Sequence, residues 1–316
     1  AASFLQYSSS LRVVRAANSG SVNAVVSGTA LQIKNTDHYQ NGDGSTGPYN
    51  DGSANVGEWA ARTAGAWGNS LQVSVCPSAT AYEETNKTTT NDSSISIGDT
   101  TLTLTSGTGF NVGDIINFGE TGGHEYRITA VSSNDITFVR HPSGTGGLHT
   151  ALAGGTQVRR RWRYYDLVDK APGTSTYTST RSGANDEMHI VVIDEDGGIT
   201  GTAGEVLEVY DSVSKASDAK TAQGDSNYYA DVIYNKSQYI YWMDHNTGGS
   251  NWGSTASGTT FTAVDSPFVD SLVSGADGSA VTTAELKSAY EKFADGDTLD
   301  VNLIIAGKGD ATHIDN

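Results

Sequence analysis

Between about residues 86 and 158 the sequence consists of short apolar pairs separated by turn residues, and no other feature restricts the fold as strongly. The pairs are Ile95/Ile97, Leu102/Leu104, Ile115/Ile116, Tyr126/Ile128 and Ile136/Phe138. Apolar residues two positions apart are typical of strands with one buried face, and the Gly-Asp and Ser-Asn turns between them favour hairpins. This block therefore predicts a small all-β barrel or sandwich.

The sequence on both sides of this block has a different character, because helical and strand-like patterns alternate there. Such alternation predicts an α/β (α+β) core in which a sheet is layered with helices. The chain has 316 residues, enough for two domains. We therefore expect a discontinuous core domain (1–85 and 159–316) with an inserted all-β domain (86–158), whose two ends lie close together.

Individual elements of the core can be read from periodicity and from turn residues. We expect strands at 11–16, 71–75, 188–193, 206–210 and 239–242, and a strand or hairpin at 22–33. Helices are expected at 57–68, 214–223 and 227–235, and surface loops at 38–56 and 244–258.

The stretch from Val281 to Gly307 changes its apolar period once. Thr282 or Thr283 can cap a helix with Glu285 in its first turn, and Leu286, Tyr290 and Phe293 form one apolar face. Asp295-Gly-Asp ends that helix, and the run Leu299–Ala306 predicts a strand covered on both faces.

Charge and composition exclude several classes of function. With 19 Lys and Arg against 36 Asp and Glu, the formal charge is −17, which disfavours binding to a nucleic-acid backbone. Arg159–Arg163 is the densest positive stretch, and its alternation with Trp162 favours a strand or linker whose arginines face carboxylates of this chain or a neighbouring one. Cys76 is the single cysteine, so no intrachain disulfide can form. No apolar run is long enough for a membrane helix.

Catalytic and metal-binding patterns fail on inspection. Ala306-Gly-Lys-Gly309 lacks both the upstream glycine and the following hydroxyl of a phosphate loop. The turn that begins at Asp194 has glycine and isoleucine at positions five and six of a calcium loop, so a solvated turn is favoured. His124-Glu125 has no second histidine four places on from His124.

His141, His149 and Asp135 could share a metal, although histidines near a turn are more often ordinary surface residues. We therefore assign no catalytic, cofactor-binding or metal-binding residue. The expectation is a protein that is not an enzyme and has no cofactor.

Four stretches resemble the tail sheath proteins of contractile-tailed bacteriophages, of the T-even-like and cyanophage myovirus type. They are SFLQYSSSLRVVRA (3–16), GAWGNSLQVSV (65–75), GEVLEVYDSVSKASDAKTAQGDSNYYADVIYNKSQYIYW (204–242) and FADGDTLDVNLIIAG (293–307). They cover somewhat under half of the chain and follow the order of that family. A weaker resemblance links 86–158 to a compact β-module of phage structural proteins.

This resemblance implies a structural subunit of a contractile tail sheath, which polymerises helically around the tail tube and rearranges on contraction to drive genome delivery. The implied partners are other copies of the chain, the tail tube protein, and baseplate and tail terminator proteins. The implied location is the virion, after synthesis in the host cytoplasm. In that family an N-terminal segment and a C-terminal domain flank the matching region, so we expect the present chain to be a central fragment.

A second interpretation is a host-surface or carbohydrate-binding phage module. It rests on the aromatic residues Tyr239, Tyr241, Trp242 and Trp252 and on the Asn/Asp-rich loops, because exposed rings suit sugar recognition. The competing interpretation of 239–242 is a buried strand. An enzyme is the third possibility.

Overall fold

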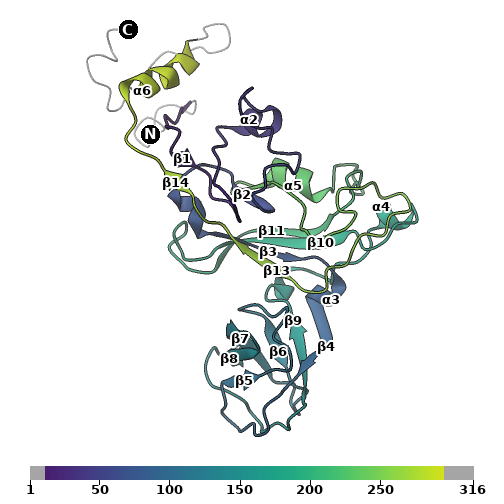
Figure 1. Cartoon of the computed structure of the whole chain (residues 1–316). Helices are drawn as coiled ribbons and strands as arrows, with labels where there is room; N and C mark the ends of the chain where they lie inside the picture. Colours follow the sequence, from purple (N-terminus) through teal and green to yellow (C-terminus); the bar gives the residue numbers. More distant parts are fainter. Residues whose placement is uncertain (1–10, 295–316) are drawn as a thin grey trace.

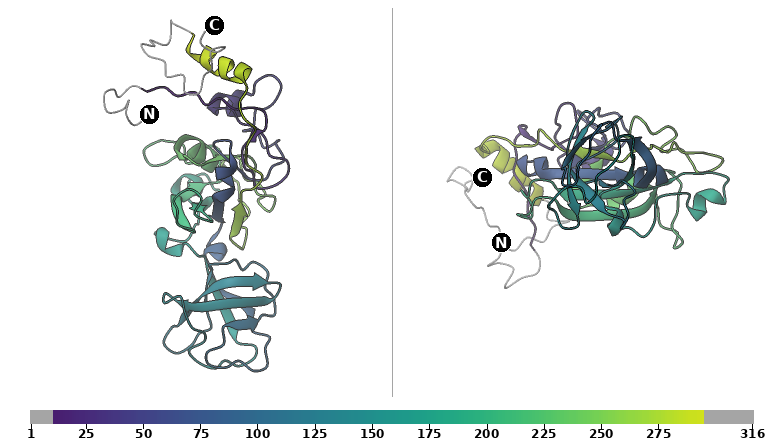
Figure 2. Two further views of the ribbon diagram at one scale, coloured as in Figure 1. Left: turned by 90° about the vertical axis from the view of Figure 1, so that its left-hand side faces the viewer. Right: turned by 90° about the horizontal axis from the view of Figure 1, so that it is seen from below.

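The computed structural model describes residues 11–294. The described chain is elongated (Figures 1 and 2), with a core in the middle, a separate β-sheet unit at one end and helix α6 (Thr283–Tyr290) at the other. We call residues 83–161 the β-lobe, and residues 17–82 and 162–278 the core. All strand pairs described are antiparallel. The fold is thus mixed α/β and consists mostly of sheets.

The centre of the core is a four-stranded sheet in the order β11-β10-β3-β13. Its strands are β3 (Leu71–Cys76), β10 (Glu187–Asp194), β11 (Glu205–Ser214) and β13 (Phe268–Ser271). Every residue of β10 is buried, since neighbouring strands and packed side chains cover both its edges and its faces. The strands predicted at 71–75, 188–193 and 206–210 are confirmed.

The two faces of this sheet are covered differently. Alternate residues such as Val73, Ile190 and Val192 pack under helix α5 (Tyr229–Lys236) and the small sheet of β2 (Trp59–Ala61) and β12 (Ile240–Trp242). On the opposite face, Val191 and Ile193 pack against Trp162 and Tyr164, which follow the β-lobe. The helix predicted at 227–235 and the strand predicted at 239–242 are confirmed.

The N-terminal part of the core corrects two predictions. Residues 38–56 are not simply a surface loop, because α2 (Thr36–Asn41) buries Tyr39, and Tyr49 joins the same apolar cluster. The helix predicted at 57–68 is instead strand β2 followed by η1 (Ala66–Ser70). Pairing of β2 with β12 overrides the helical propensity of the sequence. Residues 22–33 form no hairpin ladder, but Asn23 and Leu31 form one antiparallel bridge and the Ile33 N–H donates to the Asn23 side chain.

Two further predictions are wrong. Residues 11–16 form no strand, and Val13 is 78% exposed. Residues 214–223 form no helix, because β11 runs to Ser214 and the chain then turns. There the N–H groups of Lys215 and Ser217 donate to the carbonyls of Asp186 and Ser254, so distant backbone groups take the bonds that a helix would make. The loop at 244–258 is confirmed.

The β-lobe is a six-stranded antiparallel sheet in the order β4-β9-β6-β7-β8-β5. Its strands are β4 (Glu83–Thr89), β5 (Thr101–Thr103), β6 (Ile115–Asn117), β7 (Glu125–Ser132), β8 (Asp135–His141) and β9 (Gln157–Arg161). The described strand ladders close no barrel, although the Thr90–Leu104 bridge and the backbone bonds from Asn91 to Thr103 and from Thr105 to Thr89 link its two edge strands. Pairing of Glu83 with Arg161 confirms that the two ends lie together.

Short elements complete the described chain, and α6 begins as predicted. Thr282 and Glu285 form a reciprocal capping box at its first turn. The remaining elements are β1 (Ser21–Val22), paired with β14 (Ala276–Asp277), and α3 (Ala79–Tyr82), η2 (Tyr165–Leu167), α4 (Thr176–Ser179) and η3 (Glu291–Phe293). The predicted turn at 295–297 and strand at 299–306 lie outside the described residues.

Candidate functional site

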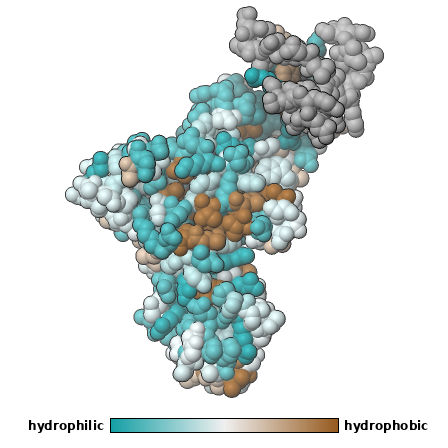
Figure 3. Space-filling view, turned by 180° about the vertical axis from the view of Figure 1, so that it is seen from behind, coloured by the Kyte–Doolittle hydropathy of each residue, from teal (hydrophilic) through white to brown (hydrophobic). Residues whose placement is uncertain are grey.

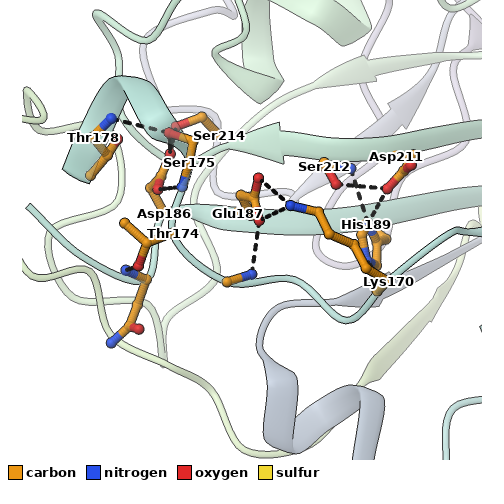
Figure 4. Close-up of polar contacts among 12 residues, drawn as sticks. Lys170, Thr174, Ser175, Thr178, Asp186, Glu187, His189, Asp211, Ser212 and Ser214 are labelled. Atoms are coloured by element: carbon orange, nitrogen blue, oxygen red, sulfur yellow. Dashed lines mark hydrogen bonds and ion pairs between the residues drawn. The ribbon is translucent and has the colours of Figure 1, made fainter. Parts of the chain in front are cut away.

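A group of buried ionisable side chains lies at the start of β10 (Figure 4). Asp186, Glu187 and His189 are each at most 6% exposed. β10 is an internal strand of its sheet. The loop at 168–178 and the end of β11 cover the polar side chains near its start. Buried polar groups of this kind are costly unless they are hydrogen-bonded, so their partners decide what the cluster can do.

Asp186 binds two hydroxyls and one backbone amide. Ser175 donates its N–H to one carboxylate oxygen (2.8 Å), and the other oxygen accepts the hydroxyls of Ser175 (2.8 Å) and Ser214 (2.6 Å). Ser175 is also the N-cap of α4, where its hydroxyl accepts the Thr178 N–H. The carboxylate therefore fastens the start of α4 to the end of β11. Both serine hydroxyls donate to this carboxylate, and within residues 11–294 no histidine is hydrogen-bonded to either.

Glu187 holds the loop that precedes α4. Lys170 donates to both of its carboxylate oxygens (3.0 and 2.9 Å), and the Gly173 N–H donates to one of them (3.0 Å). The Lys170 side chain is 57% exposed, so this ion pair contributes at most about 1 kcal/mol. Its effect is to close the loop over the sheet.

Both ring nitrogens of His189 are in use. The Lys170 carbonyl lies 2.9 Å from Nε2, while the Ser212 N–H and an Asp211 carboxylate oxygen each lie 3.0 Å from Nδ1. These two Nδ1 contacts require different protonation states, because the amide needs an acceptor and the carboxylate needs a donor. Burial lowers the pKa of His189, which favours the neutral ring with a proton on Nε2. Such a ring has no free nitrogen for proton transfer to a substrate.

Lys215 is a fully buried lysine next to this cluster. Its ammonium group donates to the carbonyl oxygens of Pro77 (2.7 Å), Asn185 (2.8 Å) and Glu187 (3.0 Å). Three acceptors match its three N–H donors. Burial lowers the pKa of Lys215 to about 8, so it remains charged at neutral pH. The ammonium ties the ends of β3, β10 and β11 together.

The cluster thus resembles an active site in composition and differs from one in connectivity. Its carboxylates, hydroxyls and imidazole bind each other and the backbone, which suits a clamp better than a reaction centre. Sequence reasoning assigned no functional residue here and missed the clamp. The available signal was Asp186-Glu187-Met188-His189, where polar residues directly precede and enter a strand that was expected to be buried.

A second polar site joins the β-lobe to the core. Arg160 is buried, and its guanidinium donates to the carbonyls of Thr80 and Ala81 in the core, with Asp265 at 3.4 Å. Arg161 forms ion pairs with Glu125 and Glu83. The prediction of a strand or linker leaving the β-lobe is confirmed, since β9 ends at Arg161, and carboxylates face Arg161 and, at 3.7 Å, Arg160.

The metal and calcium hypotheses find no support among residues 11–294. Asp135 and His141 stand at opposite ends of β8, and no cluster of three ligand side chains is found in the described part of the chain. Asp194 is buried rather than solvated, and one of its oxygens accepts N–H bonds from Ile199 and Thr200 within its own turn. The glycine-rich stretch at 306–309 lies outside the described residues.

The aromatic residues that suggested sugar binding are mostly packed inside the core. Tyr241, Trp242 and Trp252 are buried, and Tyr239 is half-buried. Cys76 is buried as well, and burial raises the pKa of its thiol. No exposed aromatic platform therefore forms from these four residues.

Within residues 11–294, no helix has the length and apolar character needed to span a bilayer. Neither a comparison with known protein families nor a search of curated proteins finds a match to this chain.

Proposed function

We propose that this chain is part of a structural subunit of a contractile phage tail sheath. The observation that carries the proposal is the resemblance of four ordered stretches to that family. Two of them lie wholly within the described residues: 65–75 contains η1 and all of β3 except Cys76, and 204–242 contains β11, α5 and β12. Both contribute to the same apolar cluster of the core, and neither lies in the β-lobe.

In this proposal residues 86–158, which make up most of the β-lobe, are a domain inserted into the sheath core, and 1–85 and 159–316 form that core. The inserted domain's own buried apolar cluster, which includes Ile116, Tyr126 and Phe138, supports a separate folding unit. The pairing of β4 with β9 supports insertion at a single point of the core. The strand pair begins at Glu83 and ends at Arg161, slightly outside the boundaries expected from sequence.

Helical sheaths are built from heterologous contacts, in which different surfaces of neighbouring copies meet. An apolar area on the rear of the core, above the β-lobe, supports a role in such contacts (Figure 3). Contraction would then be rigid-body movement of subunits between two packings, driven by energy stored in the extended assembly. Other copies, the tube protein, and baseplate and terminator proteins are the proposed partners, and the virion is the proposed location.

The test is electron microscopy of the purified full-length gene product. Long tubes or stacked rings are expected, whereas compact trimers would contradict the proposal and favour a host-surface module. Residues 1–316 alone are expected to remain monomeric in size-exclusion chromatography with light scattering, since a charge of −17 opposes association. Filaments of 1–316 at physiological salt would contradict the second expectation.

Deleting residues 88–157 and joining the stumps of β4 and β9 with a short Gly/Ser linker is expected to leave cooperative unfolding of the core intact. The deletion removes contacts within the β-lobe and the bond from Asn111 to the Pro267 carbonyl, while Arg160 and Trp162 keep their bonds with the core. The deletion is also expected to leave tube formation by the full-length protein unchanged, because we propose that the β-lobe faces outward. Loss of cooperative unfolding, or loss of assembly with folding retained, would contradict this arrangement.

A further inference from the structure

Two histidines from different loops of the β-lobe lie face to face. The ring centroids of His124 and His149 are 3.7 Å apart, and the ring planes differ by 14°. His124 ends the loop between β6 and β7, and His149 lies in the loop between β8 and β9. The contact therefore joins two loops that are distant in sequence, and sequence analysis paired neither residue with the other.

A buried carboxylate holds the same two loops together. Glu120, which is 9% exposed, accepts the N–H (3.0 Å) and hydroxyl (2.6 Å) of Thr150 on one oxygen. Its other oxygen accepts the Tyr126 hydroxyl (2.6 Å), which in turn accepts the His149 N–H (2.9 Å). The hydrogen bonds of Glu120 and Tyr126 thus connect the two loops next to the stacked rings, and they include the backbone of His149.

We propose that the stacked rings of His124 and His149 are an acid-sensitive latch, which holds loop 118–124 against loop 142–156 at neutral pH and releases it when both rings are protonated. Two uncharged imidazoles stack favourably, whereas two imidazolium ions at this separation repel each other. The charged and titratable groups that face the pair are Arg140 on β8, Glu120 in loop 118–124 and Tyr126 on β7.

These neighbouring groups do not offset the repulsion between two protonated rings. Arg140 adds positive charge near His149, and its guanidinium is fixed by a bond to the Gly147 carbonyl. Glu120 favours protonation of His149, but its oxygens already accept hydrogen bonds from Tyr126 and Thr150. Burial, Arg140 and His124, in that order, lower the pKa of His149. Below about pH 6.5 the released form therefore binds a proton on His149 more readily than the latched form does. Acid thus favours separation of the two loops.

The experiment is an NMR titration of the imidazoles of the whole 316-residue chain, combined with amide hydrogen exchange at Thr150. His124→Phe keeps an aromatic face for stacking and removes one titrating group. His141→Phe makes the same change on β8, outside the pair. In the wild type, protection of the Thr150 amide is expected to fall about tenfold or more between pH 7 and pH 5, after correction for intrinsic exchange.

In His124→Phe that loss of protection should disappear, and the pKa of His149 should rise towards its ordinary value, because the charge of His124 is one cause of its lowering. His141→Phe should behave as the wild type. An unchanged His149 titration in His124→Phe, or Thr150 protection that does not depend on pH in the wild type, would overturn the proposal. If His124→Phe does not fold, His149→Phe is measured instead, with protection read at the Tyr126 amide. This variant must also remove the acid sensitivity. If the acid sensitivity remains, the latch is refuted.

Discussion

Replacing Lys215 with methionine is expected to lower the free energy of unfolding by about 3–5 kcal/mol. The ammonium group satisfies the carbonyls of Pro77, Asn185 and Glu187, and the residue is fully buried. Methionine fills a similar volume and cannot donate a hydrogen bond. The three carbonyls therefore lose this donor where β3 and β11 end and β10 begins. Urea unfolding followed by tryptophan fluorescence measures the change.

Lys220→Met is the matched control, because Lys220 lies five residues further along the same segment and is exposed. Its effect should stay within about 0.5 kcal/mol, as for surface substitutions in general. Equal stabilities of the two variants would show that Lys215 does not hold the strand ends together.

The pH dependence gives a second measure of the same group. Burial lowers the pKa of Lys215 to about 8, whereas an unfolded lysine titrates near about 10.4. Between these values the unfolded chain binds more protons, so the contribution of Lys215 to stability increases as the pH rises. The stability difference between the wild type and Lys215→Met should therefore widen from pH 8 to pH 10.

The parts of the fold that could be predicted are those in which local pattern and tertiary packing agree. The apolar run 188–193 becomes an internal strand, and Thr282 with Glu285 begins α6 through a capping box. The period-two pairs between 86 and 158 become the β-lobe, because each hairpin buries one face in a common cluster. In these segments each local preference is satisfied by the final packing.

The remaining features depend on contacts between distant residues. Trp59–Ala61 has no strand signal of its own and becomes β2 because β12 supplies a partner nearly 180 residues later. Lys215 and Arg160 belong to residue types that are almost always exposed, and only the carbonyls that surround them explain their burial. The clamp at β10 could not be assembled from sequence, since its members come from three separate segments.

Replacing Arg160 with methionine is expected to uncouple the β-lobe from the core and to cost about 2–4 kcal/mol. The guanidinium is buried and binds the core carbonyls of Thr80 and Ala81, whereas the other side-chain bonds described between the two units, from Lys87 and Asn111, are only partly buried. Methionine retains the apolar stem and loses these bonds. Differential scanning calorimetry is expected to show two transitions in place of a more cooperative one.

Arg159→Met is the control, because Arg159 is an exposed neighbour on the same strand.

The two variants should also differ in their response to pH through Asp114, a buried residue of the β-lobe. Burial raises the pKa of Asp114 to about 7, and the charge of Arg160 opposes that rise. When the folded pKa of an aspartate lies above its unfolded pKa, the folded protein loses stability as the pH rises from the unfolded to the folded pKa. Without Arg160 the interval extends further upward, so Arg160→Met should be more destabilising at pH 8 than at pH 5. A loss that is equal at both values, or equal to that of Arg159→Met, would mean that Arg160 neither joins the two units nor compensates Asp114.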